Sequence, residues 1–86
     1  MHREGTLRVR TGRLRRWKAC LCLLAPEHFK VFHSRGGALV EVLPLAGLEV
    51  AVEVDEPLRF QLQARGRRLD LLAADSAQRA EWVGAL

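Results

Sequence analysis

The sequence predicts a mainly β fold: a seven-stranded antiparallel β-sandwich or partly open barrel, capped by one C-terminal α-helix. Three observations lead to this fold class. Turn signals recur about every ten residues, the segments between them alternate apolar and polar side chains, and the last segment changes to helical spacing. Regularly spaced turns are typical of antiparallel sandwiches and barrels built from hairpins. We expect the 86 residues to form a single domain, 1–86.

Glycine- and proline-containing turns separate the predicted strands. Between two of them, Val50, Val52 and Val54 share one face and alternate with the acidic side chains at positions 53 and 55. An alternation with period two marks a strand with one buried face, so we expect these valines to be buried. The seven predicted strands are residues 4–10, 17–24, 28–33, 38–44, 47–54, 58–64 and 67–73.

The helix is predicted for the segment that follows Asp75. Gln78 lies three residues after Asp75, and this pair resembles a capping box, in which the carboxylate accepts from unpaired backbone N–H groups. Trp82, Val83 and Leu86 then share one apolar face at helical spacing. We expect this face to close an open corner of the sandwich, with Trp82 as its largest buried side chain.

The charge of the chain is distributed unevenly. The net charge is +4, yet residues 1–20 hold seven basic side chains against Glu4, whereas residues 41–56 hold five acidic side chains and no basic one. A basic end attracts phosphate, anionic lipid or acidic protein surfaces. The alternative interpretation is a set of solvated arginines that serves solubility. The hydrophobic content of 49% is too high for a disordered chain.

Composition and cysteine spacing indicate the cellular compartment in which the protein is expected. No apolar run is long enough to cross a bilayer, and no apolar segment of a signal peptide follows the basic start. Cys20 and Cys22 occupy alternate positions of one predicted strand, where we expect them to be small inward hydrophobes and not a disulfide. We therefore expect a cytoplasmic protein that can touch a membrane peripherally.

Three other classes of function find little support in the residues. Cys20, Cys22, His28 and His33 follow a C-x-C-x5-H-x4-H spacing, which is not a usual zinc-finger spacing, so we expect no metal and no other cofactor. No motif joins a serine or histidine to a nucleophile, and no glycine-rich phosphate loop occurs, so we expect no enzyme. The five aromatic side chains form no ladder for base stacking, so no nucleic acid is expected.

Four segments in order resemble a pleckstrin-homology (PH) domain. The segment "REGTLRVR" resembles the opening Glu-Gly-x-Leu strand of that family, and "RRWKACLCLL" resembles its second strand. The segment "LPLAGLEV" resembles the step from the fourth strand to the fifth, and "LDLLAADSAQRAEWVGAL" resembles the last strand and the tryptophan-bearing helix. Together with "FQLQ", the third segment also resembles the second PH domain of faciogenital-dysplasia-type Rho exchange factors.

The resemblance implies a lipid site at the first hairpin, with one departure. The family pattern asks for a basic residue late in the first strand, which falls on Val9 or Arg10 depending on register, and for a basic-x-Arg triplet in the second. Lys18 fits the triplet, but Cys20 stands in place of its arginine and cannot offer a bidentate fork to phosphate. The candidate phosphoinositide-binding residues are Arg8, Arg10, Arg13, Arg15, Arg16, Lys18 and Lys30.

These residues predict a non-catalytic binding module. It makes weak, poorly selective contact with phosphoinositides or anionic membrane through the basic first hairpin. The alternative is a protein–protein interaction domain, an adaptor or scaffold that uses a sheet edge or groove and has no physiological lipid ligand. In either case we expect it to be part of a larger signalling protein. Trp17, at the base of the hairpin, lies either in the core, which we expect, or on a face turned to the membrane.

Overall fold

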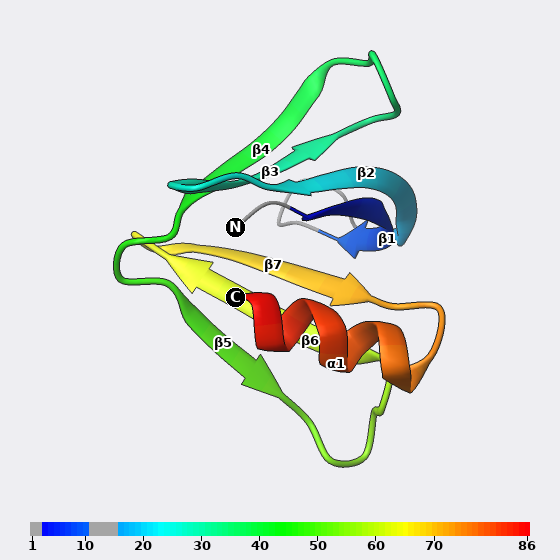
Figure 1. The fold of residues 1–86 in the computed structure, drawn as a ribbon. Coiled ribbons are helices and arrows are strands. Elements are labelled where there is room, and N and C mark those ends of the chain that lie inside the picture. Colours follow the sequence, from blue (N-terminus) through cyan, green and yellow to red (C-terminus); the bar gives the residue numbers. More distant parts are fainter. Residues whose placement is uncertain (1–2, 11–15) are drawn as a thin grey trace.

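A computed structural model describes residues 3–10 and 16–86 of the chain. Within them, seven antiparallel strands form one sheet and a single helix follows the last strand (Figure 1). The elements are β1 (Arg3–Arg10), β2 (Lys18–Leu24), β3 (His28–Phe32), β4 (Leu39–Pro44), β5 (Glu49–Val52), β6 (Arg59–Ala64), β7 (Arg67–Leu72) and α1 (Ser76–Ala85). The predicted fold class and the order of its elements are confirmed.

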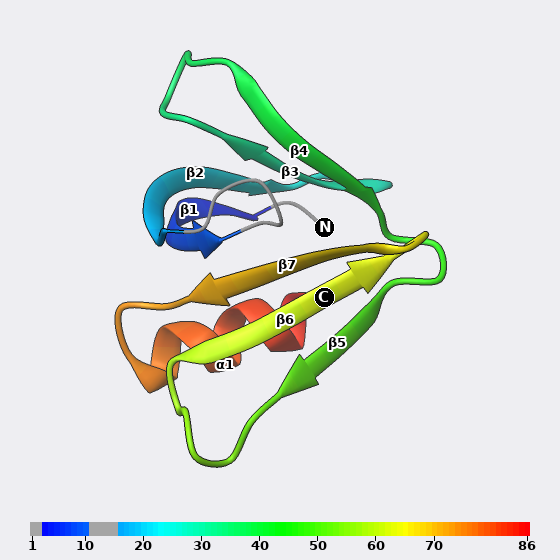
Figure 2. The same ribbon diagram turned by 180° about the vertical axis from the view of Figure 1, so that it is seen from behind.

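Strand β1 joins the two halves of the sheet. The strand order is β4-β3-β2-β1-β7-β6-β5, so β1 pairs with β2 on one side and with β7 on the other. The sheet bends between these halves, and the two halves face each other across the core (Figures 1 and 2). The barrel is not closed, because β4 and β5 form the two edges of the sheet.

The core lies between the two halves and follows the alternation of the strands. Leu7 and Val9 point inward from β1, and Cys20 and Cys22 do the same from β2, as predicted. Both cysteines are free thiols in the interior. The other fully buried large side chains are Leu24, Phe29, Val31, Leu43, Phe60, Leu62, Leu69, Leu71 and Trp82.

The helix begins at a capping box with a small change from the predicted one. The Asp75 side chain accepts from the backbone N–H of Gln78 over 2.7 Å. The Gln78 side-chain oxygen accepts in return from the backbone N–H of Ala74, one residue before the cap, over 2.6 Å. Both bonds satisfy backbone N–H groups that have no partner within the helix.

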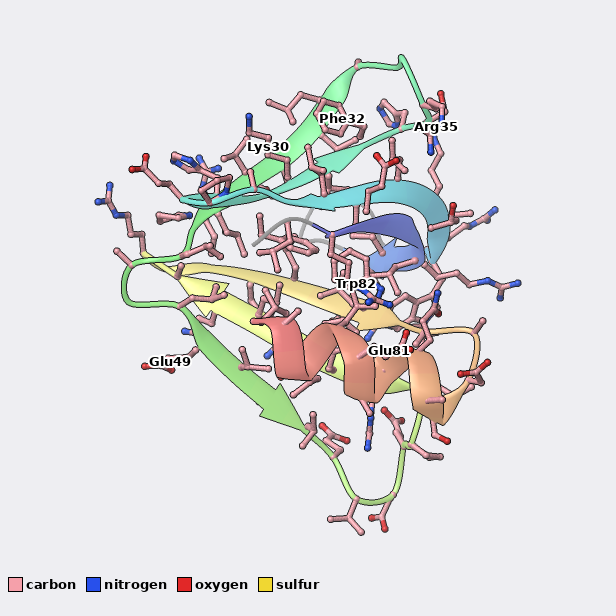
Figure 3. The ribbon with its side chains drawn as sticks, viewed as in Figure 1. Lys30, Phe32, Arg35, Glu49, Glu81 and Trp82 are labelled. Carbon is pink, nitrogen blue, oxygen red and sulfur yellow. The ribbon has the colours of Figure 1, made fainter. Side chains whose placement is uncertain are left out.

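Trp82 fixes α1 against the sheet. Its side chain is 1% exposed and meets Phe29 edge to face, with 5.9 Å between the ring centroids. Gly5 of β1 lies directly beneath it, since a Cβ atom there would sit 3.4 Å from the indole ring. Figure 3 shows Trp82 pointing from α1 toward the strands. The helix therefore covers the N-terminal half of β1, and the predicted role of Trp82 as the main buried side chain of the helix is confirmed.

One expected part of the core is not buried. Val50 and Val52 are 37% and 50% exposed, and Val54, which lies past the end of β5, is 97% exposed. The alternation of valines does form a strand, but that strand is an edge of the sheet, and no strand of the described residues lies on its outer side. The prediction of a buried valine face was therefore wrong.

No helix in the described part of the chain combines the length and the apolar character needed to cross a membrane.

Candidate functional site

The outer surface of the β1–β7–β6 half carries a cluster of arginines around one carboxylate. Arg10 of β1 is the partner of Asp70 of β7, and both point away from the core because Val9 and Leu71, their neighbours, point into it. The two residues that fit the late basic position of the family pattern therefore point to opposite faces. Val9 occupies the inner position late in β1, and Arg10 occupies the outer one.

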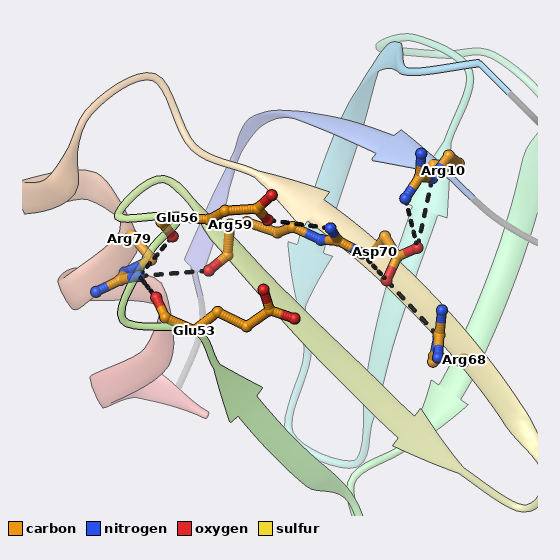
Figure 4. Close-up of polar contacts among 7 residues, drawn as sticks. All are labelled: Arg10, Glu53, Glu56, Arg59, Arg68, Asp70 and Arg79. Atoms are coloured by element: carbon orange, nitrogen blue, oxygen red, sulfur yellow. Dashed lines mark hydrogen bonds and ion pairs between the residues drawn. The ribbon is translucent and has the colours of Figure 1, made fainter.

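Three guanidinium groups converge on Asp70, as Figure 4 shows. Arg10 donates from Nε and Nη2 to Oδ2 over 3.4 and 3.3 Å. Arg59 of β6 places Nη2 3.4 Å from Oδ1, and Arg68 of β7 places Nε 3.7 Å from the same atom. We call Arg10, Arg59, Arg68 and Asp70 the outer arginine cluster. The Asp70 side chain is only 9% exposed, so the contacts that replace its hydration come mainly from these arginines.

Trp17 lies at the same surface and not in the core. The Cζ atom of Arg10 stands 4.6 Å from the centroid of the indole ring, and that of Arg59 stands 6.0 Å from it. These are cation–π distances. The indole is half-buried and is not part of the hydrophobic core, so the expectation of a core position was wrong. The physical reason is that two arginines on the outer face, Arg10 of β1 and Arg59 of β6, offer the ring cationic partners outside the barrel.

Trp17 and the cluster line a shallow cavity. It measures about 440 Å³, and the loop before β6 closes its other side through Pro57 and Leu58. Leu72 lies at its base, since it occupies the outer position on β7 opposite Arg8. The cavity thus combines an aromatic face with guanidinium groups at its rim, which is a chemistry suited to an anionic group attached to an apolar body.

Arg59 is the most firmly held member of the cluster. It also donates from Nη1 to Glu56 over 3.0 Å. The hydrogen bond to Glu56, together with the nearby Asp70, raises the pKa of Arg59 above its ordinary value, although burial acts in the opposite direction. Arg59, like other arginines, is charged at neutral pH. With Arg8, the described residues place four guanidinium groups at this surface, together with the two carboxylates of Asp70 and Glu56.

The inner side of the first hairpin is different. Lys18 faces the same side as Val9, at the rim of the barrel, and its Nζ donates to Nδ1 of His33 over 3.3 Å. Two residues on, Cys20 is buried, and burial raises the pKa of its thiol above the ordinary value. A neutral, buried thiol thus stands where the family pattern has an arginine, and Lys18 is left without its second basic partner.

The structure separates the predicted site residues by face. Arg8 and Arg10 lie on the outer face of β1, Arg16 is exposed just before β2, and Lys18 lies on the inner rim. Lys30 points outward from β3, because its neighbours Phe29 and Val31 are buried, and it lies apart from the others (Figure 3). Arg13 and Arg15 fall outside the described residues.

A metal site from the cysteines and histidines is not assembled. Cys20 and Cys22 point into the core, whereas His28 lies on the outer face of β3 beside the buried Phe29. His33 is exposed and contacts Lys18. Among residues 3–10 and 16–86, no group of three side chains is arranged to hold a metal ion.

Several members of the cluster gave no signal in the sequence. Asp70 stands between two buried leucines, and an acidic residue at such an outward position of a strand is ordinarily exposed to solvent. Arg59 and Arg68 belong to strands far from the first hairpin along the chain. Only the pairing of β1 with β7 and of β7 with β6 brings them together.

Among known proteins, similarity to this chain was found only with solved structures. No family model and no curated protein sequence matched the chain. The PH domain of human oxysterol binding protein-related protein 11 superposes with a TM-score of 0.84 at 22% identity, over 99% of this chain and 76% of that one. The PH domain of ArhGAP27 gives 0.83 at 15% identity, over 99% and 94%. The C-terminal PH domain of human pleckstrin gives 0.74 at 23% identity, over 96% and 74%.

These likenesses cover almost the whole chain and agree with the strand order and the C-terminal helix. The resemblance seen in the four sequence segments is confirmed at the level of fold. The identities are low, between 15% and 23%, so the likeness is one of fold. The chain has the pleckstrin-homology fold.

Proposed function

We propose that this domain is a non-catalytic binding module that contacts anionic membrane lipids, phosphoinositides included, weakly and with little selectivity. The observation that carries the proposal is the excess of guanidinium groups at the outer arginine cluster, next to the exposed side chains of Arg8 and Arg16. The likeness to PH domains supports a binding module over an enzyme. Fold alone does not decide the ligand.

The same geometry explains why binding is weak. Arg10 and Arg59 already give part of their hydrogen-bonding capacity to Asp70 and Glu56. At the inner rim, Cys20 and Val9 offer no charge to a head group. What remains is attraction of about 1 kcal/mol for each basic residue near an anionic surface, which falls off within a Debye length. Such attraction depends on charge density and discriminates poorly between head groups.

A vesicle assay tests the proposal. Three vesicles are compared at physiological and at low salt: phosphatidylcholine alone, phosphatidylcholine with phosphatidylserine, and phosphatidylcholine with a phosphoinositide at matched surface charge. We expect similar binding to both anionic vesicles, stronger at low salt, and none to the neutral one. Arg8→Ala/Arg16→Ala should weaken binding by about tenfold to thirtyfold, since two basic residues are removed.

Lys30→Ala is a single-charge control at a separate place on the surface. It removes one charge from the outer face of β3, apart from the cluster, and should leave binding nearly unchanged. Two results would contradict the proposal. One is tight binding to a single phosphoinositide that Arg8→Ala/Arg16→Ala does not weaken. The other is no binding to any anionic vesicle at low salt.

A further inference from the structure

Strand β5 presents an unpaired edge. Its four residues, Glu49–Val52, pair with β6 alone, and no other strand of the described chain lies on its outer side. In an antiparallel ladder alternate residues turn their backbone N–H and C=O groups away from the partner strand. Half of the backbone groups of β5 therefore point into solvent, and such a row is a template for a further strand.

The edge carries apolar side chains beside this backbone. Val50 and Val52 pair with Leu62 and Phe60 of β6, which are both fully buried, yet the two valines are 37% and 50% exposed. They continue the apolar inner face of the sheet by one strand, and residues 3–10 and 16–86 leave 37% and 50% of their surfaces exposed. A strand added beside β5 would bury the remaining surface of both valines, at about 25 cal/mol per Å² of apolar area.

The same edge is acidic and is not neutralised. Glu49, Glu53 and Asp55 are exposed, and no ion pair among the described residues involves them. Figure 3 shows Glu49 pointing away from the sheet at the start of β5. Arg79 of α1 does approach the loop after β5, but it donates to the carbonyl oxygen of Glu53 and not to its carboxylate (Figure 4). Arg79 therefore holds the backbone of the loop in place, and the carboxylate of Glu53 can still pair with a cationic group of a ligand.

The acidic side chains argue against a second copy of the chain as the occupant. Two β5 strands paired edge to edge would place the carboxylates of Glu49 and Glu53 from both chains along one ribbon, and like charges on facing strands are destabilising. The other edge of the sheet, β4, is less suited to any strand. It ends at Pro44, which has no N–H to donate, and its Glu41 is already paired with Arg67 over 2.5 Å.

We propose that β5 docks an extended basic segment of a partner protein, which adds as an outer strand. Apolar side chains of the segment lie against Val50 and Val52, and lysine or arginine side chains on its other face lie beside Glu49 and Glu53. Backbone hydrogen bonds give affinity, and the alternating side chains give specificity. This site uses residues other than those proposed for lipid contact, so either proposal can fail without the other.

The test uses a capped, fluorescent peptide with the core Lys-Val-Thr-Val-Lys, whose pattern is the same in both strand directions. A peptide with the core Glu-Val-Thr-Val-Glu is the matched control. We expect the lysine peptide to bind at least tenfold more tightly in fluorescence anisotropy, and to bind less tightly as salt rises. In a proton–nitrogen NMR titration, the shifts should centre on residues 48–54.

Two variants of the chain complete the test. Glu49→Lys/Glu53→Lys should lower affinity for the lysine peptide at least tenfold, while vesicle binding is retained. Glu27→Lys reverses an exposed charge at the turn after β2 and should leave the affinity for the lysine peptide unchanged. Both variants alter exposed side chains, and NMR spectra of each show whether the fold is kept.

Any of four results would overturn the proposal. The first three are equal binding of the two peptides, shifts centred outside residues 48–54, and an unchanged affinity in Glu49→Lys/Glu53→Lys. Dimerisation of the free chain through β5 in sedimentation velocity would also overturn it, because a second copy would then occupy the edge.

Discussion

The guanidinium group of Arg10 is held between an aromatic ring and a carboxylate: its Cζ atom lies 4.6 Å from the centroid of Trp17, and its Nη2 atom lies 3.3 Å from Asp70. Trp17 precedes β2, and Asp70 belongs to β7. One side chain therefore connects both neighbours of β1 on the outer surface. The contacts orient the guanidinium group, and the surface keeps its excess of positive charge because Asp70 is shared with Arg59 and Arg68.

Replacing Asp70 should separate stability from anion binding. Asp70→Asn leaves Arg10, Arg59 and Arg68 without their common counter-charge, so we expect the free energy of unfolding to fall by about 2–3 kcal/mol, somewhat below the cost for a fully buried pair. The same change frees guanidinium donors, so affinity for anionic vesicles or for a soluble inositol phosphate should rise several-fold. Urea denaturation and NMR titration measure the two effects. A variant that is less stable and also binds less tightly would contradict the proposed role of the cluster.

The two tryptophans should differ in their contribution to stability. Trp82→Ala removes a fully buried ring that contacts Phe29 and lies over Gly5, and should cost about 3–5 kcal/mol, which is enough to unfold much of so small a domain. Trp17→Ala removes a half-buried ring from the outer surface and should cost about 1 kcal/mol. Thermal melting followed by circular dichroism distinguishes them. Equal losses for both variants would be inconsistent with the structure.

The domain should lose stability at alkaline pH because of Cys22. Burial, reinforced by the neighbouring Cys20, raises the pKa of the Cys22 thiol from 9.0 to about 12. Between these values the unfolded chain has released the proton and the folded chain still holds it. The contribution of this thiol to the free energy of unfolding is therefore fully present below about pH 9. It falls above that pH, by up to about 1.4 kcal/mol per pH unit for each such thiol. Urea unfolding at pH 8 and at pH 10.5 measures the slope.

Cys22→Ala is the control for this pH dependence. The variant lacks the thiol and should show a flatter decline in stability between the two pH values, whatever its stability at neutral pH. Cys20, whose pKa is also raised by burial, accounts for part of the slope that remains. An unchanged slope in Cys22→Ala would assign the effect to other groups.

The start of α1 should depend on both partners of its capping box. Asp75→Ala leaves the N–H of Gln78 without its acceptor, and should cost about 1 kcal/mol of stability. Gln78→Ala releases the N–H of Ala74, which is exposed and can bond to water, so the loss should be smaller. Urea denaturation of both variants checks the order. The reverse order would show that the glutamine makes the more important bond.

The features predicted correctly from the sequence are local ones. Turn residues and the period of apolar side chains lie within a few positions of one another. This is why the cap at Asp75 and the bounds of six strands, to within one residue, were found, whereas β5 is shorter at both ends than the predicted 47–54. The burial of Cys20, Cys22 and Trp82 also follows from alternation or helical spacing alone.

The features that the sequence did not predict depend on the order of strands in the sheet. The valines of β5 alternate as those of a half-buried strand do, and only the edge position of β5 leaves them exposed. Asp70 gathers Arg10 and Arg59 through two separate pairings that no short pattern encodes. Trp17 lies on the outer surface and not in the core because it packs there against the guanidinium groups of Arg10 and Arg59.

The central position of β1 also sets the order in which a newly made chain can complete its structure. Its hairpin with β2 can form early during synthesis, whereas Arg10 must wait for Asp70, 60 residues later, and Arg3 must wait for Glu81, 78 residues later. Until then one side of β1 has no partner strand, and Trp82 of α1 does not yet cover the interior over Gly5. A ribosome-bound intermediate that ends before α1 therefore presents apolar surface to chaperones and proteases, and translation must reach the last helix before the domain becomes resistant to them.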